Sequence, residues 1–154
     1  MRFGENRRVS GKIAEVIQNE HRQLMRRLSE LDAALEGLAC YSEVYANLAS
    51  APQIQAASQW LSEWLPSHFL REENTLFTHL AALGPEAAAF TRDMKRQHEE
   101  IGRRLQAFSA EAEQLRQSQD LEQSVVALKQ FGADLTSFIA KHMKAEDKRF
   151  ATKC

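Results

Sequence analysis

Apolar residues recur at steps of three or four along four long segments of this chain of 154 residues. Because an α-helix has about 3.6 residues per turn, this spacing aligns the apolar side chains on one face of each helix. No segment has the strict alternation of apolar and polar residues that is typical of a β-strand. The pattern therefore predicts an all-α fold, an up-down-up-down four-helix bundle, which residues 1–154 form as a single domain.

The first expected helix begins after Ser10, whose hydroxyl oxygen can accept a hydrogen bond from a backbone N–H of the first turn. Gly37 is expected to end or kink this helix. The following stretch, 38–50, fits two alternatives, because it can continue the first helix or form a short second one. In both cases Pro52 is expected to stop the helix, since proline lacks a backbone N–H and its ring clashes with the preceding turn.

The second long helix is expected over residues 53–83. Pro66 lies within it and predicts a kink within two residues of His68, or a break of the helix into two pieces. Gly84 and Pro85 are expected to close this helix and open the next one. Glycine favours the position after a helix, and proline favours the first helical position.

The third helix is expected from residue 86 to about residue 117, where a polar run begins. Asp120 is expected to cap the fourth helix, which spans 121–150. The buried face of this last helix is predicted to contain Leu121, Val125, Leu128, Phe131, Leu135, Phe138, His142 and Glu146.

The charge of the chain is nearly balanced, with 20 lysine and arginine residues against 21 aspartate and glutamate residues. The basic residues are scattered, so we expect binding neither to nucleic acid nor to a membrane. Cys40 and Cys154 form no Cys-x-x-Cys pair, which excludes a zinc site built from cysteines. With no apolar run behind the charged N-terminal residues, we expect a soluble, cytoplasmic protein.

A histidine followed four residues later by a glutamate, and then by a second acid, occurs twice. The two copies are His68-Phe-Leu-Arg-Glu72-Glu73 and His142-Met-Lys-Ala-Glu146-Asp147. On a helix, positions four apart lie on one face with Cβ atoms roughly 5–6 Å from each other, so each pair can bind one metal centre. The two copies predict two halves of one site.

Residues can be counted from the end of each expected antiparallel helix. This count places both copies at the same level along the bundle axis as one histidine on the first helix and one on the third. At a rise of ~1.5 Å per residue, this layer lies within about 12–25 Å of one end of the bundle. It contains His21, His68, Glu72, His98, His142 and Glu146. A single histidine on an apolar face is usually structural, but burying six polar groups together is costly without compensation. A metal centre supplies that compensation.

These residues, in this order on four helices, resemble a hemerythrin-like domain of the His-His-Glu cation-binding type. The resemblance covers about residues 10–150 and is carried by Glu20-His21, by the two copies above and by Gln97-His98-Glu99. It implies two iron ions in a non-haem diiron centre, bridged by two carboxylates and an oxo or hydroxo group. The ligands it implies are the terminal His21, His68, His98 and His142 and the bridging Glu72 and Glu146.

The respiratory members of that family carry five histidines, with a His-x-x-x-His pair on the third helix. Here Met94 stands four residues before His98. Three explanations remain open. One iron can keep an open or water-filled position, Tyr45 or Glu20 can substitute, or the second metal is weakly held.

Two other residues compete for a place in the site. His79 is expected at the surface or at an entrance, because it lies about 10 Å nearer the end of the bundle than Glu72 does. Asp147 matches the aspartate that respiratory members place five residues after their last histidine. Helical facing, and the analogy with Glu72, favour Glu146 over Asp147.

Imidazole and carboxylate ligands without a thiolate suit two iron ions, with manganese as an alternative, better than tetrahedral zinc. An iron pair with an open position would bind O2 or NO there. The side chains expected to form the wall of that pocket are Trp64, Leu24, Met94, Ile101 and Phe138.

Three functions fit the sequence. The leading one is a sensor, store or carrier of a diatomic ligand, O2 or NO. The second is an iron-handling or stress protein that repairs iron centres or consumes peroxide or NO. It depends on the resemblance alone, because no nucleophile, general-base pair or substrate pocket is readable, so an enzyme is the less expected outcome. The third is a metal-free helical interaction module. The protein partner and the oligomeric state are open.

Overall fold

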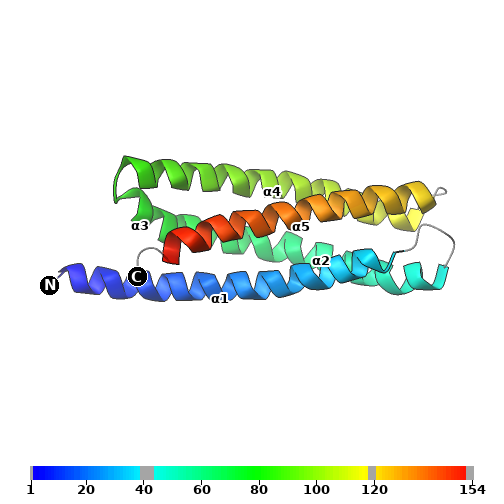
Figure 1. The fold of residues 1–154 in the computed structure, drawn as a ribbon, viewed down its shortest axis with the longest axis horizontal. Coiled ribbons are helices and arrows are strands. Elements are labelled where there is room, and N and C mark those ends of the chain that lie inside the picture. The colour runs from blue at the N-terminus through cyan, green and yellow to red at the C-terminus, as the bar shows by residue number, and fades with distance from the viewer. Residues whose placement is uncertain (1, 39–43, 118–120, 152–154) are drawn as a thin grey trace.

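The computed structural model describes the backbone of residues 2–38, 44–117 and 121–151 and the side chains of residues 11–38, 50–115 and 123–150. Within these ranges it is helical throughout apart from turns, with no strand. The elements are α1 (Arg2–Glu36), α2 (Val44–Arg71), the π-helical turn η1 (Glu72–Leu76), α3 (Phe77–Ala81), α4 (Pro85–Gln117) and α5 (Leu121–Ala151). Because α2, η1 and α3 follow one another without a break, they form one long segment (Figure 1).

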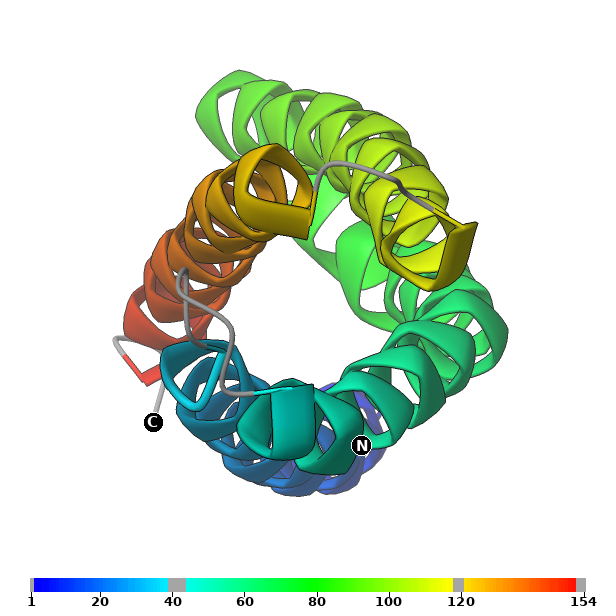
Figure 2. The ribbon, with the colours of Figure 1, turned by 90° about the vertical axis from the view of Figure 1, so that its right-hand side faces the viewer.

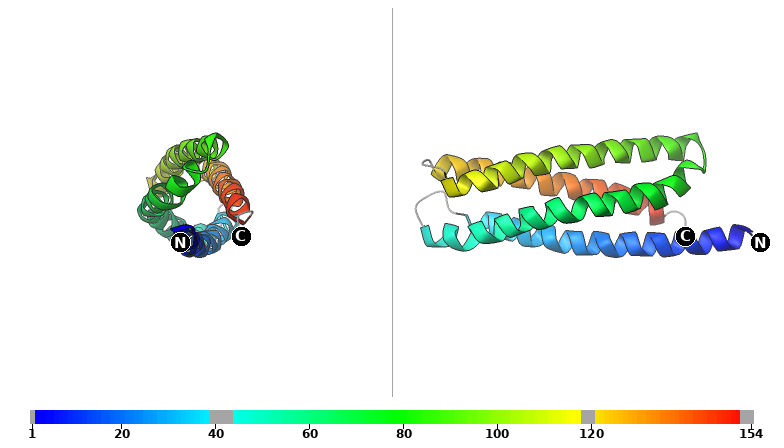
Figure 3. Two further views of the ribbon diagram at one scale, coloured as in Figure 1. Left: turned by 90° about the vertical axis from the view of Figure 1, so that its left-hand side faces the viewer. Right: turned by 180° about the vertical axis from the view of Figure 1, so that it is seen from behind.

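The four long segments form an antiparallel bundle. Figure 2 shows them as a ring in the order α1, α2, α4, α5, and each packs against its two neighbours. The start of α1, the end of α5 and the turn between α3 and α4 lie at one end of the bundle, and the N-terminal part of α1 extends beyond the other helices there (Figures 1 and 3). The predicted all-α, up-down-up-down architecture is confirmed.

The described side chains form a core of two apolar clusters. The larger includes Leu24, Leu65, Ile101 and Ile139, and the smaller includes Ile17, Leu76, Phe77, Met94 and Phe150. On every long segment, the residues predicted to bind metal lie between members of one cluster and members of the other. The polar layer is therefore enclosed by apolar residues along the bundle axis. No described helix combines the length and the apolar character needed to cross a membrane.

Two predicted helix boundaries are wrong. The first helix begins at Arg2, so Ser10 lies inside it and is not its N-cap. Residues 2–9 contain no proline, and extending a helix that has already formed costs little. Pro52 does not stop a helix either, because α2 runs from Val44 through both Pro52 and Pro66. Both prolines are exposed, so water can reach the carbonyl groups that lose a backbone partner.

Residues 44–50 neither continue the first helix nor form a separate short one, because they begin α2, which was expected to start at residue 53. The remaining boundaries agree with the sequence. The helix ends at Glu36 and is followed by Gly37, whose N–H donates to the Ala33 carbonyl at 3.1 Å. Gly84 has a φ of 145°, which favours glycine, and Pro85 begins α4. The predicted cap Asp120 lies outside the described residues.

The buried face of α5 differs from the prediction at its centre. Phe131 is 40% exposed, and Ile139 is fully buried. Gly132 takes the place on the buried face that was predicted for Phe131, because a Cβ atom there would lie 2.4 Å from Cδ1 of Leu35 and 3.2 Å from Cε2 of Phe108. The backbone of α5 thus approaches α1 and α4 too closely for a side chain at this position.

Candidate metal centre

The six residues predicted to share one layer do lie together, deep inside the bundle. Each of the four long segments contributes a histidine, and α5 and the start of η1 each add a glutamate. Both glutamates are completely buried, and none of the histidines is more than 6% exposed. Their potential ligand atoms form two groups, Glu72 with His21 and His68, and Glu72 with His98, His142 and Glu146, within each of which all atoms lie within 4.8 Å of one another.

The four histidines form two pairs. In the first pair, the ring centroids of His21 and His68 are 5.0 Å apart. In the second pair, those of His98 and His142 are 4.8 Å apart. The two glutamates lie between the pairs, so imidazole nitrogens face carboxylate oxygens from both sides.

Glu72 reaches both pairs. Its Oε2 lies 3.1 Å from Nε2 of His21, and its Oε1 lies 3.2 Å from Nε2 of His68. The same Oε1 lies 3.2 Å from Nε2 of His98 in the second pair. One carboxylate can therefore contact a metal ion at either pair.

Glu146 mirrors this arrangement from the opposite side. Its Oε1 lies 3.0 Å from Nε2 of His142 and 3.6 Å from Nε2 of His21. Its Oε2 lies 3.8 Å from Nε2 of His98. Both glutamates thus have the position that a bridging carboxylate needs between two cations.

Most inner atoms of this layer lack ordinary hydrogen bonds, and the exception is the contact of 3.1 Å between Nε2 of His21 and Oε2 of Glu72. Among the described residues, Nε2 of His68, His98 and His142, Oε1 of Glu72 and both carboxylate oxygens of Glu146 have no hydrogen-bond partner. Leaving so many buried polar atoms unpaired costs roughly 1–3 kcal/mol for each of them. A metal ion would accept these lone pairs at once, so the residues present fit a metal centre.

The outer nitrogens of three of the histidines are held by hydrogen bonds. Nδ1 of His21 donates to Oδ1 of Asp147 at 2.7 Å, and Nδ1 of His68 donates to Oε2 of Glu20 at 2.9 Å. Nδ1 of His142 donates to Oε1 of Gln97 at 2.8 Å. In a neutral ring, a proton on Nδ1 leaves the lone pair on Nε2, which points inward. This is the tautomer that a metal-binding histidine requires.

Without a metal ion, the pKa values of the buried histidines shift in opposite directions. Burial alone lowers the pKa of His21, but its contacts with Asp147 and Glu72 outweigh burial and raise it to about 9. Burial and the nearby charge of His98 lower the pKa of His142 to about 3, so this ring stays neutral. A neutral imidazole is ready to bind a cation.

The two glutamates differ in the same way. Burial raises the pKa of Glu72, but its contacts with His21, His68 and His98 outweigh burial and bring the pKa well below its ordinary value. Burial and then the charge of Glu72 raise the pKa of Glu146 well above its ordinary value. Two adjacent buried carboxylates resist ionising together, and a divalent cation between them removes that resistance.

Glu72 opens a π-helical turn that was not predicted from the sequence. The N–H of Phe77 donates to the carbonyl of Glu72, five residues back, and the hydroxyl of Thr78 donates to the carbonyl of Glu73 at 3.1 Å. A signal for it was present. Trp60, Trp64, His68, Glu72 and Leu76 are spaced by fours, and each step of four turns an α-helix about 40° beyond a full turn. A wider turn corrects this drift, and π turns are common at functional sites.

Aromatic rings fix the orientation of two histidines. Trp64 stacks on His68 with centroids 4.8 Å apart and ring planes 12° apart. His98 lies between Phe69, at 3.8 Å, and Phe77, at 5.5 Å, and both are nearly parallel to it. Stacking restricts the rotation of each ring and thereby aims its Nε2 at the centre.

The remaining candidates lie away from the centre. His79 is exposed, as predicted. Asp147 and Glu20 contact the outer nitrogens of histidines, and Tyr45 is near the beginning of α2, far from His68 near its end, with its side chain outside the described residues. Met94 is buried in the smaller apolar cluster.

The five residues expected to line a ligand pocket occupy different environments. Leu24 and Ile101 are fully buried in the larger cluster, and Met94 belongs to the smaller one. Trp64 and Phe138 are only partly buried, and the guanidinium of Arg104 lies 4.2 Å above the ring of Phe138. Their role as a pocket wall stays a prediction.

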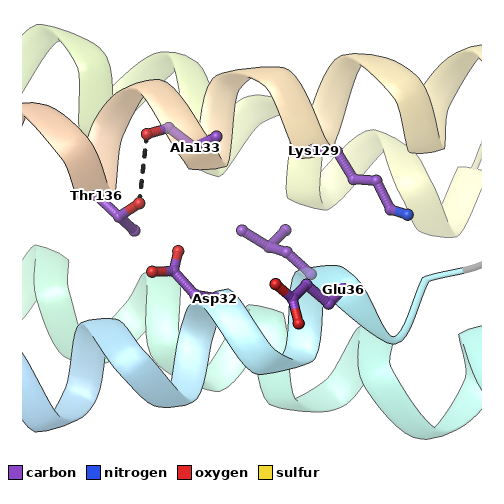
Figure 4. Close-up of a pocket in the computed structure, with 6 residues that line it drawn as sticks. Asp32, Glu36, Lys129, Ala133 and Thr136 are labelled. Carbon is purple, nitrogen blue, oxygen red and sulfur yellow. Dashed lines mark hydrogen bonds between the residues drawn. The ribbon is translucent and has the colours of Figure 1, made fainter.

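A groove between α1 and α5 is separate from the polar layer. It has a volume of about 400 Å³ and is lined by Asp32, Leu35, Glu36, Lys129, Ala133 and Thr136 (Figure 4). The Thr136 hydroxyl donates to the Ala133 carbonyl of its own helix at 3.3 Å. None of the six site residues lines this groove, so it plays no part in the candidate centre.

Comparison with known proteins agrees with this geometry. The model of one protein family, described as the hemerythrin HHE cation binding domain, matches residues 12–154. No curated protein and no solved structure gives a significant match to the chain. The family match spans nearly the whole bundle, and the buried histidines and glutamates fit a cation site. The chain therefore belongs to the hemerythrin family of HHE cation-binding domains.

Proposed function

We propose that this protein is a non-haem diiron protein that binds O2 or NO as a sensor, store or carrier. One iron ion would be held by the first histidine pair and the other by the second pair, with both glutamates bridging them. The ligands would be His21, His68, His98, His142, Glu72 and Glu146. The observation that carries this proposal is the position of both carboxylates, each within 3.8 Å of Nε2 atoms from both histidine pairs.

The geometry favours Glu146 over Asp147 as the second bridge. Glu146 is fully buried between the pairs, whereas the side chain of Asp147 is 43% exposed and bonds to the outer nitrogen of His21. The same argument assigns Glu20 to an outer position behind His68. Neither of these outer carboxylates then substitutes for the histidine that is replaced by Met94.

The donor set favours iron, with manganese as the alternative. Six nitrogen and oxygen donors without a thiolate suit cations that accept five or six ligands, whereas zinc prefers four. Four histidines and two bridging carboxylates give each ion four protein ligands, which leaves coordination positions open. Bound iron(II) would supply electrons and an open position for a diatomic molecule.

The protein side chains would orient the histidine ligands and limit the access of water. The outer hydrogen bonds keep the histidines in the metal-binding tautomer, and the stacked Trp64, Phe69 and Phe77 hold the rings in place. The apolar clusters above and below the layer limit the access of water. A small uncharged ligand enters such a site more easily than a charged or bulky one.

Ligand binding can be tested by visible absorption spectroscopy of the iron-loaded protein. We expect the reduced protein to be nearly colourless and to gain a visible band within seconds of exposure to O2 or NO. Azide added to the oxidised protein should shift that band, because it takes the open position. A spectrum that none of the three ligands changes would contradict O2 or NO binding.

The same preparation separates the alternative functions. Repeated consumption of added peroxide or NO, or transfer of iron to an apo-protein, would favour an iron-handling or stress protein. A metal-free interaction module would need no metal for stability, yet the unpaired buried atoms of the layer argue against it. We further propose that residues 1–154 act as one domain in the cytoplasm.

A further inference from the structure

The centre has an internal two-fold repeat that relates the α1–α2 half of the bundle to the α4–α5 half. Under this repeat, His21 on α1 corresponds to His98 on α4. The segment with His68, Glu72 and Glu73 corresponds to the segment with His142, Glu146 and Asp147. The residue before each single histidine is then also related, and this is where the halves differ, because Glu20 corresponds to Gln97.

The inner contacts of the two halves are alike. Each half offers two histidine Nε2 atoms, and each glutamate touches histidines of both halves. The residues four positions before the single histidines, Ile17 and Met94, are both buried and apolar. The kinds of inner contact are the same in both halves, but Glu146 joins the group of close ligand atoms at the second pair and not the group at the first. A tighter position at the first pair would therefore have to come from the outer contacts.

The outer contacts of the first pair are made by two carboxylates. Asp147 accepts the Nδ1 proton of His21 at 2.7 Å, and Glu20 accepts that of His68 at 2.9 Å. Glu20 is only 13% exposed and also accepts hydrogen bonds from Arg71, which fixes it in place. Both histidines of the first pair are thus backed by a negative charge.

In the second pair, neither histidine donates a hydrogen bond from Nδ1 to a carboxylate. Behind His142 stands the amide oxygen of Gln97, at 2.8 Å from Nδ1. Behind His98, Oε1 of Glu73 lies 3.9 Å from Nδ1, and this nitrogen has no hydrogen-bond partner among the described residues. The amide group of Gln97 in turn donates to Asp93 at 3.3 Å. The carboxylate of Asp93 thus contacts Gln97, and Gln97 separates it from His142.

We propose that the two metal positions are unequal, that the position at His21 and His68 binds its ion more tightly, and that Glu20 and Gln97 are the positioning residues that set this difference. The inference rests on the proposed two-metal centre. A carboxylate that accepts the outer N–H of a histidine makes its inner nitrogen a stronger donor, and loss of such a partner typically costs about 10–100-fold in metal affinity. An amide oxygen has no net charge and strengthens the donor less.

The test is a titration of the metal-free protein with Co²⁺, which is stable in air and reports its ligands through its visible spectrum. We expect two binding steps in the unaltered protein. Glu20→Gln should weaken the first step by at least ~10-fold and leave the second within about 3-fold. Glu99→Gln, on an exposed residue beside His98, makes the same charge change and should alter neither step.

The converse variant should strengthen the weaker position. Because Gln97 donates to Asp93, Gln97→Glu is made together with Asp93→Asn, and Asp93→Asn alone is its control. We expect the double variant to tighten the second step by ~10-fold or more relative to Asp93→Asn, and to leave the first step unchanged. A gain in affinity is an outcome that mere loosening of the structure does not produce.

The outcomes separate this inference from the proposed function. Binding of two Co²⁺ ions per chain would support the two-metal centre. The inference of unequal positions would then be contradicted if Glu20→Gln weakened both steps equally, or if the Gln97→Glu variant failed to tighten the second step. One ion per chain supports the inference if the Gln97→Glu variant takes up a second ion, and contradicts it if it does not. A chain that binds no Co²⁺ overturns both.

Discussion

Replacing Glu72 by glutamine is expected to lower the metal content from two ions per chain to fewer than one. Glu72 lies within 3.2 Å of three histidine Nε2 atoms, and it is the one residue common to both groups of potential ligands. An amide keeps the size of the side chain but loses the charge and one acceptor oxygen. Since loss of an outer partner already costs ~10–100-fold in affinity, loss of a shared inner ligand should cost more. Elemental analysis of the purified variant measures the effect.

Two matched variants serve as controls for this result. Glu99→Gln removes the same charge from an exposed position, and His79→Ala removes an exposed histidine, so both should keep the full metal content. The Glu72 variant should remain folded, which its circular dichroism spectrum can establish, because most of the core is apolar. If the folded Glu72→Gln protein retained two ions, Glu72 would not be a bridging ligand.

Removing the metal is expected to lower the thermal stability substantially. An ion that binds only the folded chain adds about 2.7 kcal/mol to the free energy of unfolding when its free concentration is 100 times its Kd. For a chain of this size that corresponds to a change in Tm of roughly 5–11 °C for each ion. Without the ions, the unpaired atoms of His68, His142 and Glu146 also stay buried at a cost.

Differential scanning calorimetry before and after treatment with a chelator measures this change. Adding Fe²⁺ back under anaerobic conditions should restore the original Tm. The chelator should have little effect on the Tm of the Glu72→Gln protein, because that protein has little metal to lose. An unchanged Tm in the unaltered protein would indicate that its histidines are structural residues rather than metal ligands.

The architecture and the inner layer could be predicted from the sequence because both follow from local rules. The three-four spacing identifies the buried face of each helix, and the constant rise per residue places His21, His68, Glu72 and His98 at one height. Errors of several residues at the helix ends did not matter. The far N-terminal extension of α1, for example, leaves the position of His21 relative to the other helices unchanged.

Features that depend on close packing between helices could not be predicted in the same way. Hydrophobicity predicts Phe131 rather than Gly132 on the buried face of α5. In the structure Gly132 lies there, because the neighbouring helices come too close to leave room for a side chain. The outer partners Gln97 and Asp147 bond to histidines of a neighbouring helix, and such contacts depend on how each helix is rotated. The sequence placed both residues beside predicted ligands, and the family resemblance also singled out Asp147, but neither signal indicated an outer position.

If the two histidine pairs and two glutamates hold two metal ions, a count of metals per chain must show them. The protein should be purified without chelators after expression with ample iron, and its metals measured by inductively coupled plasma mass spectrometry. We expect close to two iron or manganese ions per chain. Fewer than one transition-metal ion per chain would contradict the proposed dimetal centre.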